Sequence, residues 1–269
     1  MTTKSESFIF ATYNVLHGYH KDLLIKNIRF LIAEKHADLL FFQEAETNFE
    51  RPLNDLLRDC GGGAWRVEYA HSDNGGDLAI AWNAARLTLR DKEIIPLSPL
   101  PGPTLIQRLK GRHNASERLA FTAKFLIAGK SIWATNTHLA WEGGVGHRLA
   151  QIAFLRKTLA RSSPDCDILA GDFNTLGMKF FQRPQERKIE SILGPQFKNV
   201  LPDLPWSQDI SCTAPQDRWE TIAKLCRFFH IKLRSRFDYI FTRNLEVVSA
   251  DMLDLPGSDH RPLIGTFTY

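Results

Sequence analysis

Short runs of apolar residues that stop abruptly at polar side chains recur along the chain. Residues 8–14, 37–44 and 168–174 each begin with apolar side chains and end at Asn14, at Gln43 and Glu44, or at Asp172 and Asn174. Runs of this length, bounded by polar residues, are typical of buried β-strands and too short for most helices. The pattern therefore predicts several buried strands whose ends carry polar side chains.

Other segments complete an alternation of strands and helices. Period-two or continuous apolar patterns predict further strands at 65–69, 77–82, 87–95, 118–127, 130–137, 236–242, 245–252 and 263–268. Apolar residues at helical spacing predict helices around 24–32, at 53–57 before the glycines at 61–63, at 148–161, at 190–193 and at 219–233. Residues 179–188 are expected to form a basic loop or the start of a helix. No linker or change of composition divides the chain, so we expect residues 1–269 to form a single domain.

Composition narrows the class of protein without identifying it. A hydrophobic fraction of 43% with 24% charged residues is ordinary for a globular protein, and the net charge of +4 is compatible with an anionic partner. The four cysteines form no CxxC pair, which favours reduced thiols in a cytoplasmic protein. No signal-peptide pattern and no long apolar run is present, so we expect a cytoplasmic chain without a transmembrane segment, and a monomer.

The polar strand ends form a set with defined chemistry. Asp172 and Asn174 are two residues apart on a predicted strand, so their side chains project from the same face. Together with Glu44, His138 and His260 they supply oxygen donors and imidazoles but no thiolate, a set that suits Mg²⁺ better than Zn²⁺. Phosphoester hydrolysis needs a metal to offset charge, a base to orient water and a proton donor for the leaving oxygen.

Six short motifs resemble those of a known superfamily. They are Thr-Tyr-Asn at 12–14, Phe-Gln-Glu at 42–44, Asn-Thr-His at 136–138, Gly-Asp-Phe-Asn at 171–174, Phe-Asp-Tyr-Ile-Phe at 237–241 and Ser-Asp-His at 258–260. In this order they resemble the endonuclease/exonuclease/phosphatase superfamily, which has the fold of DNase I. The resemblance covers nearly the whole chain and implies an α/β (α+β) fold: a four-layer α-β-β-α sandwich of two mixed β-sheets.

The resemblance also implies a role for each matching residue. The implied metal ligands are Asn14, Glu44 and Asp259, for Mg²⁺ with Mn²⁺ as a substitute. The implied catalytic residues are His138, Asp172, Asn174, Asp238 and His260, with Asp172 acting on water and Asp238 fixing the imidazole of His260. The implied substrate-binding residues are Asn136, Arg118 and Arg148. The remaining histidines, His17 among them, have no motif around them and are expected to be structural or exposed.

The superfamily contains nucleases and other phosphodiesterases, and several substrates stay open. Three basic segments, 107–113, 179–188 and 218–236, neighbour the predicted site loops, and the last contains interleaved aromatic side chains. Such a rim suits nucleic acid, which favours a nuclease, either an endonuclease or an exonuclease. It also suits a phospholipid surface, so a sphingomyelinase-like phosphodiesterase is the next candidate. The inositol phosphatases are disfavoured because their tryptophan-cysteine-aspartate-arginine signature is absent, and a non-enzymatic binding module with the same fold is a further alternative.

Overall fold

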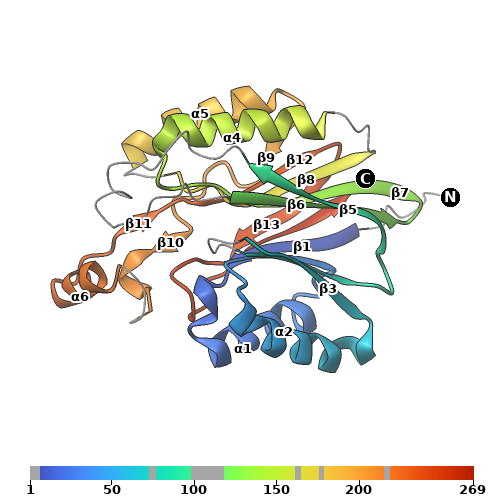
Figure 1. Ribbon diagram of the computed structural model, residues 1–269, viewed down its shortest axis with the longest axis horizontal. Helices are drawn as coiled ribbons and strands as arrows, with labels where there is room; N and C mark the ends of the chain where they lie inside the picture. Colours follow the sequence, from blue (N-terminus) through green and yellow to red (C-terminus); the bar gives the residue numbers. More distant parts are fainter. Residues whose placement is uncertain (1–6, 73–76, 98–117, 161–164, 176–178, 215–218) are drawn as a thin grey trace.

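The computed structural model describes residues 7–72, 77–97, 118–160, 165–175, 179–214 and 219–269. Two β-sheets lie face to face, with helices α4 (Gly144–Leu159) and α5 (Lys179–Leu193) on one outer side and α1 (Lys21–Ala33) and α2 (Thr47–Asp59) on the other (Figure 1). This is the four-layer α-β-β-α sandwich with the DNase I-like fold, as the family resemblance implied.

The first sheet has six strands in the order β13-β14-β1-β2-β4-β3. Their bounds are β1 Ser7–Asn14, β2 Leu39–Gln43, β3 Trp65–Ala70, β4 Leu78–Asn83, β13 Glu246–Met252 and β14 Leu263–Thr268. The second sheet has the order β5-β6-β7-β8-β12-β9. Its bounds are β5 Thr88–Leu97, β6 Arg118–Ile127, β7 Lys130–His138, β8 Cys166–Asp172, β9 Lys198–Asn199 and β12 Asp238–Arg243.

Each sheet contains one parallel pair of strands joined through a helix. β1 pairs with β2 in parallel across the crossover that holds α1, and β7 pairs with β8 in parallel across α4. Parallel strands bring their carboxyl ends to the same edge of a sheet. Asn14 is therefore level with Gln43, and His138 with Asp172, while antiparallel β12 sets Asp238 opposite Asp172.

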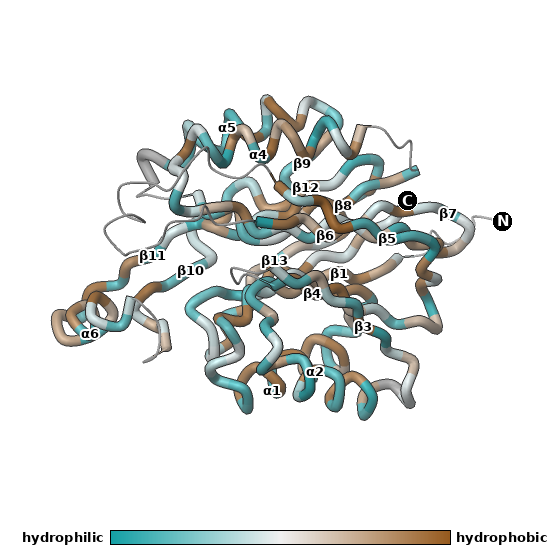
Figure 2. Tube along the Cα trace, in the orientation of Figure 1, coloured by the Kyte–Doolittle hydropathy of each residue, from teal (hydrophilic) through white to brown (hydrophobic). Residues whose placement is uncertain are grey.

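Apolar side chains fill the three spaces between the four layers. The central space holds a cluster from both sheets that includes Phe10, Phe41 and Phe121, and separate clusters lie under α1 and α2 and under α4 and α5. Figure 2 shows hydrophobic segments concentrated toward the sheets and on the inner sides of the helices. Burial of these faces from water supplies the main driving force for stacking the layers.

One buried side chain ties the two sheets together through hydrogen bonds. Asn136 of β7 donates its Nδ2 protons to the Phe42 carbonyl oxygen at 2.8 Å and the Ala79 carbonyl oxygen at 3.0 Å. Its Oδ1 accepts a hydrogen bond from Gln43 Nε2 at 2.7 Å. The carboxamide thereby links the second sheet to both β2 and β4 of the first sheet.

Residues 179–188 were expected to form a basic loop or the start of a helix, with a short helix at 190–193. The helical alternative is confirmed, and only the division into two segments was wrong. A continuous helix, α5, covers the whole segment although Pro184 lies inside it. Its buried positions Gln182, Gln185, Ile189 and Leu193 recur every three or four residues. Because two of the four are glutamines, the apolar pattern alone marked only the last turn.

The predicted helix at 219–233 is shorter than expected. α6 covers Glu220–Phe228 and ends where the Ile231 N–H donates to the Cys226 carbonyl oxygen and the His230 N–H donates to that of Arg227. His230 has a φ of 54°, so these contacts form the Schellman motif that ends many helices. The chain then continues into β11 (Arg234–Ser235), which pairs with β10 (Gln208–Asp209) as a separate two-stranded ribbon.

Two further observations bear on the sequence predictions. The basic segment 107–113 lies outside the described residues. Within the described part of the chain, no helix is long and apolar enough to cross a membrane.

Candidate functional site

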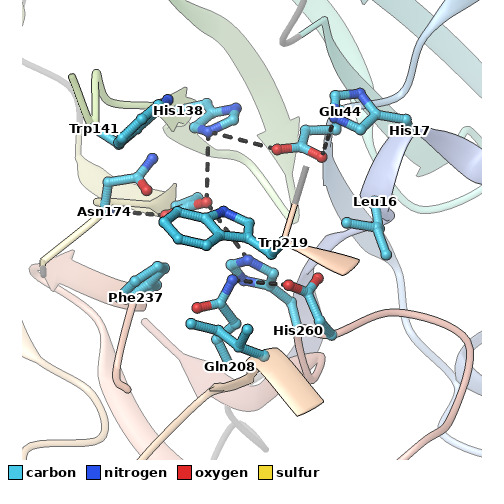
Figure 3. Close-up of a pocket in the computed structure, with 13 residues that line it drawn as sticks. Leu16, His17, Glu44, His138, Trp141, Asn174, Gln208, Trp219, Phe237 and His260 are labelled. Atoms are coloured by element: carbon cyan, nitrogen blue, oxygen red, sulfur yellow. Dashed lines mark hydrogen bonds and ion pairs between the residues drawn. The ribbon is translucent and has the colours of Figure 1, made fainter. Parts of the chain in front are cut away.

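A pocket opens at the edge of the sandwich where the polar strand ends converge (Figure 3). Its floor is polar, and its walls include aromatic and aliphatic side chains. The residues that line it are Leu16, His17, Glu44, His138, Trp141, Asp172, Asn174, Gln208, Ile210, Trp219, Phe237, Asp259 and His260. Six of the residues predicted from sequence, Glu44, His138, Asp172, Asn174, Asp259 and His260, therefore share one pocket.

Asp172 lies at the centre of the polar floor, at the end of β8. One carboxylate oxygen accepts the Asn174 N–H at 2.8 Å, and the other accepts Asn14 Nδ2 at 3.1 Å. The preceding residue, Gly171, has a φ of +136°, and a Cβ atom there would lie 2.0 Å from the Thr137 carbonyl oxygen. Glycine is therefore required for β8 to run this close to β7 and carry Asp172 to the pocket.

Asp238 and His260 form a buried carboxylate–imidazole pair. His260 Nδ1 lies 2.8 Å from Asp238 Oδ2, which also accepts the Ser207 hydroxyl at 2.7 Å. The same Ser207 Oγ accepts the backbone N–H groups of Phe237 and Asp238, each at 2.9 Å. Ser207 thus fixes the carboxylate that orients the imidazole, a role that no sequence motif indicated.

His138 lies between the two carboxylates on the other side of the floor. Its Nε2 is 3.5 Å from Asp172 Oδ2 and 3.9 Å from Glu44 Oε1. Behind the ring, Arg118 Nη1 is 3.4 Å from His138 Nδ1. Arg118 is itself buried and so reaches the site through His138.

Asp259 enters the pocket from the loop before β14. Its Oδ2 accepts a hydrogen bond from Gln208 Nε2 at 2.9 Å, and its carbonyl oxygen accepts the Asp209 N–H at 2.7 Å. These contacts attach the β10–β11 ribbon to the loop that carries Asp259. Gln208, another wall residue, was not indicated by the sequence because it lies in a proline-marked loop.

His17 was expected to be structural or exposed, and the structure places it against Glu44. His17 Nε2 is 3.1 Å from Glu44 Oε2, and its Nδ1 is 2.6 Å from Glu46 Oε1. The imidazole therefore connects Glu44, which lines the pocket, to Glu46, which does not. The contact with Glu46 fixes the ring, and the ring in turn positions the Glu44 carboxylate.

Backbone strain is concentrated at this pocket. Within the described part of the chain, eight residues other than glycine have a positive φ, and four of them line the pocket: Leu16, His17, Glu44 and Asn174. Such conformations cost free energy and persist where the surrounding structure enforces them, which is common at functional sites. The left-handed turns at Glu44 and Asn174 direct the side chains that follow β2 and β8 into the pocket.

Burial and mutual charge shift the pKa values of two groups on the floor. Burial, followed by the charges of Asp238 and Glu44, raises the pKa of Asp172 to about 7, although His260 and the Asn174 N–H oppose the shift. Burial alone would lower the pKa of His260, but Asp238, Asp259 and Asp172 raise it well above its usual value. The imidazole is thus held as a cation among carboxylates.

The donor set fits a divalent cation. Asp172, Asp238 and, in its neutral form, His260 each offer one ligand atom, and these atoms lie within 4.8 Å of one another. The carboxylates of Glu44 and Asp259 line the same pocket, so negative charge exceeds the one positive charge expected on His260. A bound cation would offset this excess, and oxygen-rich sets of this kind suit hard divalent ions.

Five residues that the family resemblance assigned to the site do not line the pocket: Asp238 and Arg118, which contact His260 and His138, and three more that lie behind the pocket wall. Asn14 donates to Asp172 and accepts the Leu16 N–H, and Asn136 uses its carboxamide to join the sheets. Arg148 donates to the carbonyl oxygen of Trp141 at 3.3 Å and to Gln185 Oε1 at 3.3 Å. These contacts position the pocket residues. Direct contact of the three with metal or substrate stays a prediction.

The His17–Glu44 contact leads to a test with a matched control. His17→Asn should raise the Mg²⁺ concentration for half-maximal activity about tenfold, because Glu44 loses the imidazole that fixes its carboxylate. His36 is exposed and has the same φ of 54°, so His36→Asn controls for the backbone effect. A Mg²⁺ titration that gives the same half-maximal concentration for both variants would contradict the role of His17.

Comparison with known proteins identifies a family that matches most of the chain. Residues 11–260 match the Endonuclease/Exonuclease/phosphatase family. No curated protein matches the sequence.

Several solved structures share this fold. The structure of D. rerio TDP2 complexed with single-strand DNA product superposes with a TM-score of 0.70 at 16% identity, covering 98% of this chain and 100% of that one. An endonuclease/exonuclease/phosphatase protein from Bacteroides vulgatus gives 0.71 at 16% identity, with 97% and 98% covered. The human Nocturnin catalytic domain with bound sulfate gives 0.66 at 17% identity, with 97% and 94% covered.

Proposed function

The chain belongs to the endonuclease/exonuclease/phosphatase family, a family of metal-dependent phosphoesterases, and from this membership we propose that it is a Mg²⁺-dependent phosphodiesterase acting on nucleic acid. The observation that carries the substrate class is the composition of the pocket walls. Trp141, Trp219 and Phe237 flank the charged floor, and the two tryptophan rings are 6.2 Å apart in an edge-on arrangement. Aromatic faces next to a phosphate site are suited to stacking nucleobases.

Each floor residue has a chemical role in this proposal. Asp172 is the group that orients the attacking water and accepts its proton, and burial keeps its basicity high. His260, held as a cation by Asp238, offers its Nε2 proton to a phosphate oxygen. His138, backed by Arg118, stabilises charge on the opposite side of the phosphate.

The metal adds one function to those of the side chains. Glu44 and Asp259 are the carboxylates that would hold Mg²⁺, with Mn²⁺ as a substitute. When bound, the cation would neutralise charge on the phosphoryl oxygens and so lower the barrier to attack.

A panel of substrates tests this proposal. With Mg²⁺, the purified chain should cleave single-stranded DNA or RNA, and EDTA should reduce the rate at least about 100-fold because charge on the phosphate is no longer offset. Mn²⁺ should restore the rate after EDTA treatment. Release of phosphocholine from sphingomyelin micelles, with every nucleic acid left intact, would refute the substrate class. Undiminished cleavage in EDTA would refute the need for a metal.

A further inference from the structure

The most exposed apolar surface of the described chain lies on α6 and the turn that follows it. Twelve large hydrophobic residues are exposed in the described part of the chain, and six of them fall between residues 222 and 233. They are Ile222, Leu225, Phe228, Phe229, Ile231 and Leu233. Phe228 is 76% exposed, and Phe229 is 61% exposed. We call this set the α6 surface.

The α6 surface stands apart from the core of the fold. Figure 1 shows α6 projecting beyond the end of the sandwich, next to the β10–β11 ribbon, and Figure 2 shows hydrophobic segments along it. Ala223 and Cys226 are the buried residues of this helix, so one narrow side faces the protein. Every residue from 227 to 234 is exposed. The apolar side chains therefore serve no purpose in the core, and an exposed patch of this kind usually marks a binding surface.

The charged residues of the segment that carries the α6 surface are all basic. Between residues 221 and 237 the sequence contains no Asp or Glu, whereas Lys224, Arg227, Lys232 and Arg234 are all exposed. Lys224 pairs with Glu220 at 2.6 Å, and Arg234 Nε lies 2.9 Å from Asp209 Oδ2. The ring of basic side chains around apolar ones matches a surface that has an apolar interior and negatively charged head groups.

Composition favours a bilayer over nucleic acid or a second copy of the chain. Four of the six apolar side chains are leucine or isoleucine, which have no flat face on which a base could stack. A second copy would bring the same positive charges together. Aliphatic and phenylalanine side chains with flanking lysine and arginine are, by contrast, the composition of helices that lie in a membrane interface.

We infer that the α6 surface docks this protein onto anionic lipid bilayers, with Phe228 and Phe229 entering the apolar layer. Lys232 lies between Ile231 and Leu233, where its ammonium group can meet lipid phosphate or carboxylate groups. Trp219, which lines the pocket, directly precedes α6. Docking through α6 therefore brings the pocket close to the membrane surface. The inference does not depend on which phosphodiester the pocket cleaves.

Vesicle binding by the full chain tests the inference. The protein should sediment with phosphatidylcholine vesicles that contain phosphatidylserine, should bind pure phosphatidylcholine much less, and should be released by salt. The double variant Phe228→Ser/Phe229→Ser should lower the partition coefficient at least about tenfold, because two exposed rings no longer enter the bilayer. Lys232→Glu should weaken binding only where phosphatidylserine is present.

Matched controls separate docking from folding and from catalysis. Val247 and Val248 are exposed apolar residues on β13, so Val247→Ser/Val248→Ser should bind vesicles like the wild type. Hydrolysis of bis(4-nitrophenyl) phosphate, a small soluble diester, should be unchanged in the Phe228→Ser/Phe229→Ser variant. The inference is overturned if wild type ignores phosphatidylserine vesicles, if the double variant binds them equally well, or if that variant loses binding to single-stranded DNA but not to vesicles.

Discussion

Asp172→Asn should lower kcat by at least about 100-fold while leaving the fold intact. Asp172 lies at the centre of the pocket floor, within 3.5 Å of His138 Nε2 and 3.8 Å of His260 Nε2. Asparagine retains an oxygen that can accept the Asn174 N–H, but it cannot take a proton from water. Steady-state kinetics on the best substrate of the panel measure the effect, and a variant with nearly wild-type turnover would remove Asp172 from the mechanism.

The same substitution should alter how stability depends on pH in the metal-free protein. Asp172 and His260 both have raised pKa values, so folding takes up protons near neutral pH. Stability of the wild type should therefore fall as pH rises from about 5 to about 8, because the unfolded chain binds fewer protons than the folded one. In the Asp172→Asn variant, the decrease in stability that the wild type shows below about pH 7 should be absent. Thermal melts in EDTA across this range measure it, and identical pH profiles for the two proteins would contradict the shifted pKa of Asp172.

Gly171→Ala should be the most destabilising of the single substitutions considered. The new Cβ would meet the Thr137 carbonyl oxygen at 2.0 Å, and the φ of +136° is strained for any residue with a side chain. Overpacking against backbone combined with this strain should cost about 4 kcal/mol, equivalent to a fall in Tm of roughly 10 °C.

Gly129→Ala is the matched control. Gly129 also has a positive φ, +78°, but a Cβ there would have no heavy atom within 4 Å. Its cost should be about 1 kcal/mol, from backbone conformation alone. If calorimetry gives the same Tm for both variants, close approach of β8 to β7 is not what requires glycine at position 171.

The strands and their polar ends could be predicted from the sequence because each depends on a local pattern. An apolar run that stops at Glu44 or at Asp172 specifies both the buried strand and the side chain at its end. Asp238 and His260 were predicted to pair only through the family resemblance, and the structure places His260 Nδ1 2.8 Å from the Asp238 carboxylate. The pairing of these residues is a property of topology, which local pattern does not encode.

What the sequence missed depends on contacts between distant segments or on unusual backbone. His17 reaches Glu44 because its own φ is 54° and that of Leu16 is 47°, and side-chain pattern carries no signal for such a turn. Ser207 supports Asp238 from 31 residues away in a loop without a motif. The aromatic walls come from three separate segments, so Trp141 and Trp219 become neighbours only in the folded chain.

The carboxamide of Asn136 determines how rigidly the two halves of the pocket are held relative to each other. Glu44 follows a strand of the first sheet, whereas His138 and Asp172 end strands of the second. Sliding one layer over the other would break the three buried hydrogen bonds of Asn136, at a net cost of about 3 kcal/mol. The distance between the carboxylates of Glu44 and Asp172 is therefore set by how the two sheets are aligned. A ligand that bridges these carboxylates meets a gap of fixed width.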